Sequence, residues 1–204
     1  MASSRRIDAF VRRLEQAIAR ELEGRDRVPL AYSGGLASTL VAMVARKRCA
    51  LECVVAGVEG SPDVVAAKAA KLYLDYRIEH VIVTRDAAAS IRARIEAAHP
   101  GLSAGDLDNL VPVHAAVERA DGRTILSGFG LAPLRPAVVA ALGDINVALP
   151  IRVASRGTSL SRLTLRRAAV DLGLPVPWAR VAHRSPANGA GVRELLRSAE
   201  RDRE

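Results

Sequence analysis

The chain has 204 residues, which fits one domain, and half of them are hydrophobic, so a sizeable core can form. Two cysteines, arginines throughout the N-terminal region and the lack of a long apolar run argue against a disulfide-stabilised secreted fold, a signal peptide and a membrane span. The formal net charge is +8, almost all from arginine, which indicates either a solvated basic surface or a phosphate-rich partner such as a nucleotide or RNA. We therefore expect a cytoplasmic protein.

The first predicted element is an amphipathic helix over residues 7–22, where apolar residues recur at helical spacing and Gly24 follows the end. A short apolar run at 28–32 then predicts a buried strand. Ser33-Gly34-Gly35 breaks this strand, and residues 36–47 continue with helical spacing and without proline or glycine. Strand, glycine turn and helix thus follow one another directly.

This arrangement exposes several backbone N–H groups at a helix N-terminus, and such a nest, with the helix dipole behind it, binds phosphate or pyrophosphate. Gly34 and Gly35 let the backbone approach an anion closely, and the hydroxyls of Ser33 and Ser38 are further donors. An ordinary strand–helix turn, with glycines for steric reasons only, is the alternative interpretation. The segments that follow favour the phosphate site.

Strands and helices continue to alternate after this turn. We expect strands at residues 51–58, 78–83 and 124–127, and helices at 64–73, 86–99 and 106–120, the last interrupted near Pro112. Ser61, Pro62 and Asp63 form a strong helix start signal, so Asp63 is interpreted first as a capping residue and second as a ligand contact. The alternation predicts an α/β fold with a parallel sheet of about five buried strands.

Glycine-bearing turns come directly after three of the predicted strands, at residues 33–35, 57–60 and 127–130. In parallel sheets, ligands bind at the carboxyl ends of the strands, near a switch in strand order. We therefore expect the three turns to converge on one crevice.

Taken together, these motifs resemble the PP-loop ATP pyrophosphatases, and in particular the synthetase domain of asparagine synthetase and its stand-alone archaeal-type relatives. The resemblance is carried by Ser33-Gly34-Gly35-Leu36-x-Ser38, Gly57-x-x-Gly60-Ser61-Pro62-Asp63, Ser127-Gly128-x-Gly130, Leu165-Arg166-Arg167-Ala168-Ala169 and Leu172-Gly173-Leu174-Pro175. It implies a single domain over residues 1–204, an adenine-nucleotide alpha-hydrolase-like (Rossmann-like) sandwich. A leading helix at 1–27, a nucleotide-binding core at 28–133 and a shortened C-terminal segment with a helical extension at 134–204 would compose it.

The resemblance also implies that ATP or AMP binds in the crevice, with adenine near residues 56–58 and the ribose near Ser127 and Gly128. The nucleotide contacts that it implies are Ser33, Gly34, Gly35, Ser38, Thr39, Ala56, Gly57, Val58, Ser127, Gly128 and Gly130. Candidate phosphate contacts are Arg162, which corresponds to a lysine of the family, and Arg180 and Arg184 in the basic run near the tail.

The sequence departs from the family pattern where carboxylates are expected. In the family, a loop aspartate and an acidic pair hold magnesium and the pyrophosphate of ATP, whereas this chain has Ala37, Ala132 and Pro133 there. The stretch that lines the aspartate pocket of the family is also absent after Leu134. Magnesium stays a candidate cofactor, but it needs oxygen ligands, usually carboxylates, and we assign it none.

Three functions are consistent with this pattern. The first is a degenerate relative, a pseudoenzyme that binds an adenine nucleotide or a separate partner subunit. The second is an active ATP-dependent, AMP-forming carbon–nitrogen ligase of the asparagine synthetase type, using ammonia or a separate glutaminase, because Ala2 stands where a built-in glutaminase needs cysteine. The third is a basic RNA- or tRNA-binding module. The Ser-Gly-Gly loop favours the first two, and the missing carboxylates favour the first. We assign no catalytic residue.

Overall fold

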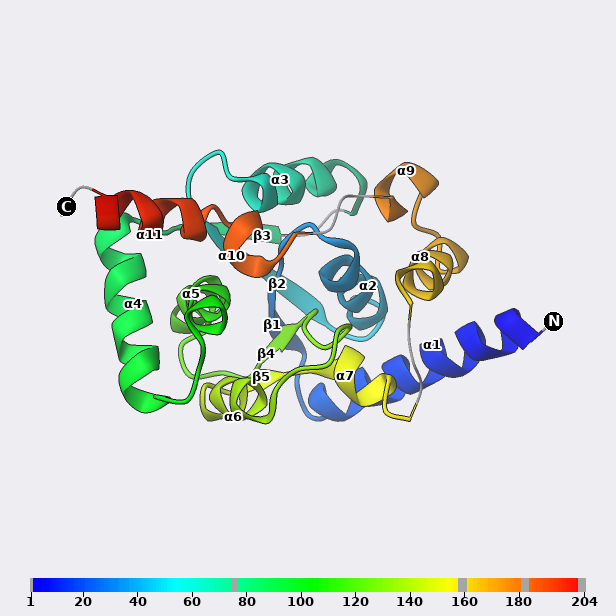
Figure 1. Ribbon diagram of the computed structural model, residues 1–204. Coiled ribbons are helices and arrows are strands. Elements are labelled where there is room, and N and C mark those ends of the chain that lie inside the picture. Colours follow the sequence, from blue (N-terminus) through cyan, green and yellow to red (C-terminus); the bar gives the residue numbers. More distant parts are fainter. Residues whose placement is uncertain (1, 75–76, 158–160, 181–183, 202–204) are drawn as a thin grey trace.

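The computed structural model of the protein describes residues 2–74, 77–157, 161–180 and 184–201. Its centre is a single five-stranded sheet with the order β3-β2-β1-β4-β5, in which every pair of neighbouring strands is parallel (Figure 1). The strands are β1 (Arg27–Ala31), β2 (Ala50–Gly57), β3 (Arg77–Ile82), β4 (Ile125–Ser127) and β5 (Val147–Ala148). The predicted α/β fold with a parallel sheet is confirmed.

Helices connect the strands and continue after β5. Those of the first part are α1 (Ala2–Glu21), α2 (Leu36–Ala45), α3 (Pro62–Leu74), α4 (Arg85–Ala98), α5 (Ala104–Arg119) and α6 (Pro136–Asp144). After β5 come α7 (Pro150–Ala154), α8 (Arg162–Asp171), α9 (Val176–Ala179), α10 (Pro186–Gly189) and α11 (Val192–Arg201). None of the described helices combines the length and the apolar character needed to cross a membrane.

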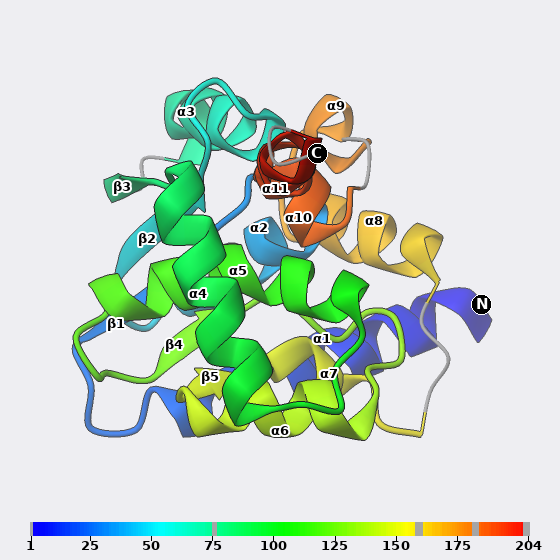
Figure 2. The same ribbon diagram turned by 60° about the vertical axis from the view of Figure 1, so that its left-hand side comes forward.

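The sheet separates two hydrophobic cores, because alternate residues of a strand point to opposite faces. On β2, Cys53 and Val55 pack into the core under α1, α2, α7 and α8, whereas Val54 and Ala56 pack into the core under α4, α5 and α6. Figures 1 and 2 show the two helical layers on either side of the sheet. Aromatic residues make up only 3% of the chain, and alanine, valine, leucine and isoleucine form most of both cores.

The prediction that all these strands are buried is wrong for β3. Only residues with two neighbouring strands and two covering layers are shielded on every side, and β3 pairs with β2 alone. Ile82 is 57% exposed as a result, and burial returns only at Val83, just past the strand. The apolar run in the sequence could not reveal that this strand lies at the edge of the sheet.

Two local predictions in the helices also need correction. The helix with Pro112 is not interrupted there, because α5 continues through it. Proline removes one backbone donor, but Leu110, Val111 and Val113 around it are buried and hold the helix in place. Residues 188–191, whose Asn-Gly-Ala-Gly sequence predicts a loop, instead begin within the short helix α10, whose N-terminal residue is Pro186.

Candidate functional site

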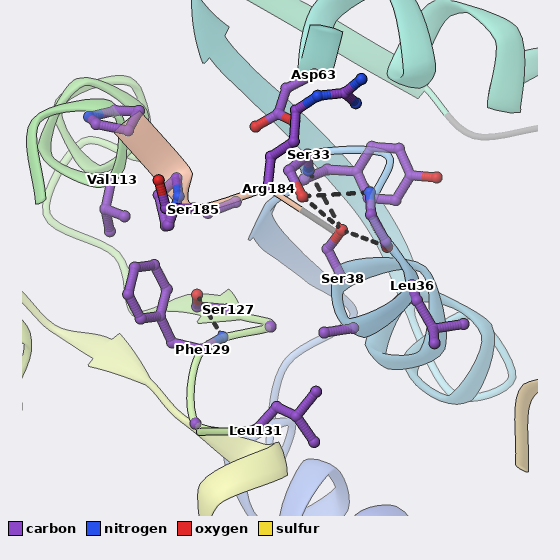
Figure 3. A pocket seen from close by; sticks show the side chains of 18 of the residues that line it. Ser33, Leu36, Ser38, Asp63, Val113, Ser127, Phe129, Leu131, Arg184 and Ser185 are labelled. Atoms are coloured by element: carbon purple, nitrogen blue, oxygen red, sulfur yellow. Dashed lines mark hydrogen bonds between the residues drawn. The ribbon is translucent and has the colours of Figure 1, made fainter. Parts of the chain in front are cut away.

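A cavity of about 350 Å³ opens at the carboxyl ends of β1 and β4. These neighbouring strands mark the switch point of the sheet, because the chain adds β2 and β3 on one side of β1 and then β4 and β5 on the other. The walls come from the turns after β1 and β4, from β2, α3, α5 and α8, and from the residues at the start of α10. Figure 3 shows labelled side chains from the two turns, from α3 and α5 and from the residues before α10 around the same space.

The turn after β1 is held in one conformation by its own hydrogen bonds. The hydroxyl oxygens of Ser33 and Ser38 lie 3.2 Å apart and share a hydrogen bond, and the backbone N–H of Gly35 donates to the Ser33 hydroxyl over 3.3 Å. Gly34 has a positive φ of 66°, and a Cβ there would lie 2.7 Å from the Cβ of Ala66 on α3. Only glycine therefore lets this turn approach α3 while α2 begins at the edge of the cavity.

The turn after β4 packs directly against the start of α2. A Cβ on Gly128 would lie 2.6 Å from the backbone nitrogen of Ser38, so the two turns touch through glycine. Ser127 is buried, and its hydroxyl accepts a hydrogen bond of 3.2 Å from the backbone N–H of Phe129. The structure thus brings together two of the three glycine turns at one cavity, with Ser33, Gly35, Ser38, Ser127, Gly128 and Gly130 in its lining.

The third turn, after β2, lies outside the cavity. The carbonyl oxygen of Ala190 accepts a hydrogen bond of 2.9 Å from the backbone N–H of Val58, and a Cβ on Gly57 would lie 3.1 Å from the same oxygen. The segment after α10 therefore covers Gly57 and Val58, and β2 presents Val54 and Ala56 to the cavity instead.

Thr39 and Gly34, both expected at the nucleotide, also lie behind the lining. The Thr39 hydroxyl is 3.1 Å from that of Tyr32, with which it shares a buried hydrogen bond. Gly34 is buried and faces α3. Both residues support the turn.

Arginines form a further part of the cavity wall. Arg162 and Arg184, two of the candidate phosphate contacts, line the cavity, whereas Arg180 is exposed at the end of α9 and does not. Arg166 also lines it and was missed as a site residue by sequence reasoning. The available signal was its spacing of four residues from Arg162, which places both on the same face of a helix.

Asp63 is the carboxylate of the cavity wall, among the residues that the structure describes. It lies in the first turn of α3, and a Cβ on Gly189 would lie 2.3 Å from its Oδ1, so α10 packs directly over the carboxyl group. Burial raises the pKa of Asp63 to about 7, and the nearby positive charge of Arg184 opposes this rise. Figure 3 shows the side chains of Asp63 and Arg184 beside each other.

With this geometry established, the comparison with known protein families becomes specific. The asparagine synthase family model matches residues 9–130, which is more than half of the chain. The chain belongs to the asparagine synthase family. The matched region holds α1, the sheet as far as β4 and both glycine turns of the cavity, and it ends just before Leu131 and Ala132.

Solved structures give weaker similarities. The chain is similar to NAD+ synthetase from Burkholderia pseudomallei, with 16% identity and a TM-score of 0.49, over 90% of this chain and 74% of that chain. It is also similar to a predicted subunit of tRNA methyltransferase from Methanocaldococcus jannaschii DSM, with 17% identity and a TM-score of 0.41, over 74% of this chain and 91% of that chain. No curated protein matches the chain. The family assignment therefore rests on the sequence match.

The side chains of this family member do not fit the magnesium ion that its relatives imply. Ala37 and Ala132, which stand where carboxylates are expected, both line the cavity and present methyl groups to it, and Pro133 is exposed outside it. Asp63 lies beside Arg184 and has a raised pKa, so its carboxyl group is a poor ligand for a cation. Within the described part of the chain, no group of three or more histidine, cysteine or acidic side chains could hold a metal ion.

Proposed function

We propose that this member of the asparagine synthase family binds an adenine nucleotide in the cavity and cleaves ATP slowly or not at all. The observation that carries the proposal is the pairing of a preserved glycine turn with Ala37 and Ala132 in the same lining. The turn supplies what phosphate binding needs, namely free N–H groups at the start of a helix. The alanines lack what metal-assisted cleavage needs.

The two halves of the cavity suit the two ends of a nucleotide. Val54, Ala56 and Val113 form an apolar surface for adenine, deeper than the residues 56–58 that sequence reasoning favoured, because Ala190 covers the end of β2. Ser127 and Gly128, at the end of β4, line the same cavity against the start of α2, and a ribose would fit there. The phosphates would then reach both Ser33–Ser38 and the arginines.

Catalysis is expected to be weak because no described residue of the cavity lining replaces the metal's chemistry. A metal ion stabilises the charge on a departing pyrophosphate, an effect worth several kcal/mol, or roughly a thousandfold or more in rate. Backbone N–H groups and arginines hold and orient phosphates, but the residues that the structure describes form no carboxylate cage to place a cation between them. The protein's own residues can therefore bind and position the nucleotide without promoting its cleavage.

Calorimetric titration tests the proposal, with ATP, AMP and adenosine as ligands and GTP as the control for the base. We expect the adenine compounds to bind and GTP to bind more weakly, and an assay of pyrophosphate release from ATP to stay at background with aspartate and ammonia present. An Ala37→Glu variant should lose ATP binding through charge repulsion, whereas Ala89→Glu, at an exposed site on α4, should not. Absence of binding by every adenine compound at millimolar concentration would contradict the proposal.

The charge distribution supports a second candidate, a basic RNA-binding module. Residues 150–190 contain seven arginines and a single acidic residue, Asp171, so they hold most of the net charge of +8. RNA binding of this kind depends on many phosphate contacts and weakens steeply as salt increases. Binding of a short RNA that exceeds the affinity for every mononucleotide, with that salt dependence, would favour this candidate.

A further inference from the structure

The three arginines of the cavity wall lack close ion pairs among the described residues, although the charge of Arg184 acts on Asp63 beside it. Arg162, Arg166 and Arg184 form no ion pair and donate no hydrogen bond there, although the protein's other arginines pair with glutamate or aspartate at several places on the surface. Asp63 is the one acid of the described lining and, with a pKa of about 7, it is partly protonated at neutral pH. The cavity wall therefore holds more positive than negative charge.

Arg166 is the most enclosed of the three. Its side chain is partly buried, whereas Arg162 and Arg184 are exposed, and its Nε is fully buried without a hydrogen-bond partner. The Ser185 hydroxyl, which also lines the cavity, is a second buried polar atom without a partner. Buried hydrogen-bond donors are almost always paired in folded proteins. Two unpaired donors, the Arg166 Nε and the Ser185 hydroxyl, beside one cavity therefore indicate a missing acceptor.

We propose that Arg162, Arg166 and Arg184 form a metal-independent site for a phosphate chain, with Arg166 as its buried ligand. The proposal rests on the proposed function in one respect, since it concerns the phosphate end of the same cavity. The chemical class is a pyrophosphate unit, either free or as part of a nucleotide. Several negative charges match several guanidinium groups, and the planar guanidinium donates two parallel hydrogen bonds to phosphate oxygens.

This site would do with side chains what the family does with a metal ion. Arginines on α8 and just before α10 would neutralise the phosphates that the glycine turns also contact. A magnesium ion bound to the ligand would add positive charge next to a wall that is already positive and would occupy the phosphate oxygens that Arg166 needs. Magnesium should therefore weaken binding of the phosphate chain, the opposite of its usual effect.

The test is calorimetric titration of the full chain with sodium pyrophosphate, once in EDTA and once with excess Mg²⁺. In EDTA, Arg166→Met should lose about tenfold or more in affinity, because charge-assisted hydrogen bonds to phosphate are among the strong ones. Arg166→Lys keeps the charge without the planar guanidinium group, so its affinity for pyrophosphate should lie between those of the natural chain and Arg166→Met. The matched control is Arg167→Met, on the same helix but exposed and outside the cavity.

The melting temperature of each variant is measured as a control for folding. Arg166→Met keeps the aliphatic part of the side chain and removes a buried unpaired donor, so its melting temperature should not fall. Equal affinity of the Arg166→Met and Arg167→Met proteins, or binding that requires Mg²⁺, overturns the proposal. Binding of AMP and adenosine without any binding of pyrophosphate also overturns it while leaving the proposed function intact. Arg166-dependent binding of pyrophosphate without binding of adenosine or AMP supports it and counts against the proposed function.

Discussion

The two walls of the cavity would bind anions by different means. The turns after β1 and β4 use backbone N–H groups, hydroxyls and glycines at fixed positions, and they lie inside the region that matches the asparagine synthase family. The arginine wall of α8 and the start of α10 uses side chains and lies outside that region. Backbone recognition depends on close packing of the turn, whereas side-chain recognition can be rebuilt one substitution at a time. The metal ligands of the first wall can therefore disappear while the cavity keeps an affinity for phosphate.

The first wall is expected to be the more fragile, and Gly34 gives the largest effect. Gly34 and Gly60 have nearly the same positive φ, 66° and 72°, but a Cβ meets α3 at 2.7 Å only on Gly34. Gly60→Ala should cost about 1–2 kcal/mol from backbone strain alone. Gly34→Ala should cost roughly 1–3 kcal/mol more from overpacking.

Urea unfolding of both variants measures this difference. Because Ala66 is part of the helix that the turn rests on, we also expect Gly34→Ala to lose nucleotide binding, and Gly60→Ala to keep it. Equal destabilisation by the two substitutions would mean that the contact with α3 does not constrain the turn.

Much of the first wall could be predicted from the sequence because its determinants are local. An apolar run, two glycines and a helical stretch specify the turn after β1 without reference to the rest of the chain. The expectation that this turn meets the one after β4 was also correct, since the carboxyl ends of parallel strands share an edge. Contact between Gly128 and Ser38 confirms it.

The second wall could not be predicted in the same way because its placement depends on packing between distant elements. Leu165, Ala168 and Ala169 are buried against the core under α1 and α2, and they set the rotation of α8 that turns Arg166 toward the cavity. Ala190 covers Gly57 and Val58 from more than a hundred residues away in sequence, so the third turn was expected at a site from which it is excluded. No local pattern carries either fact.

Restoring the family's acidic side chains should make the first wall metal-dependent. Ala37→Asp and Ala132→Asp together place two carboxylates in the lining, which gives Mg²⁺ oxygen ligands. In EDTA, we expect the double variant to bind ATP more weakly than the natural chain, because the new carboxylates repel the phosphates. Addition of Mg²⁺ should raise the affinity of the double variant about tenfold above its own affinity in EDTA. The single variants are the controls and should show smaller responses.

Titration of ATP at several Mg²⁺ concentrations measures this coupling. If the natural chain already shows the full magnesium response, the cation is held by other groups and the argument from Ala37 and Ala132 is wrong. Pyrophosphate release by the natural chain at rates near the ~10 s⁻¹ of typical enzymes would also contradict it.

Asp63 joins the two walls, and its carboxyl group should make stability depend on pH. The pKa of its carboxyl group is raised from an ordinary value of 3.8 to about 7 in the folded protein, so between these values the folded state holds a proton that the unfolded state has lost. Folding stability from this group therefore falls as pH rises from about 4 to 7 and stays low above that. Asp63→Asn removes the titration.

Melting temperatures across this range test the direction. The Asp63→Asn protein should match the natural chain near pH 4 and melt several degrees higher at pH 8, since each kcal/mol shifts the melting temperature by about 2–4 °C in a domain of this size. Pyrophosphate binding should also weaken above pH 7 in the natural chain, as the ionised carboxylate repels the phosphates, and this loss should be absent from the variant. If the Asp63→Asn protein melts at a higher temperature at pH 4 than at pH 8 and the natural chain does not, Asp63 is not the group that lowers stability as the pH rises.

His114 on α5 should have the smallest effect on stability, and its pH dependence should have the opposite sign to that of Asp63. Measuring both distinguishes the carboxyl group in the cavity from the buried histidine. Burial, with the positive charges of Arg94 and His99, lowers the pKa of His114 to about 4, while Glu118 partly opposes this. The ordinary pKa of histidine is 6.5, so between pH 4 and 6.5 the unfolded state binds a proton that the folded state does not, and stability is lost as the pH falls through this range. Its Nε2 is also buried without a hydrogen-bond partner. His114→Leu should therefore leave the melting temperature nearly unchanged at pH 7.5 and raise it by a few degrees at pH 4.5.

In the Asp63→Asn, His114→Leu double variant the two pH responses should add, because the groups lie on different helices and neither charge shifts the pKa of the other. A double variant whose stability still changes steeply between pH 4.5 and pH 8 would show that other groups control the pH response of this fold.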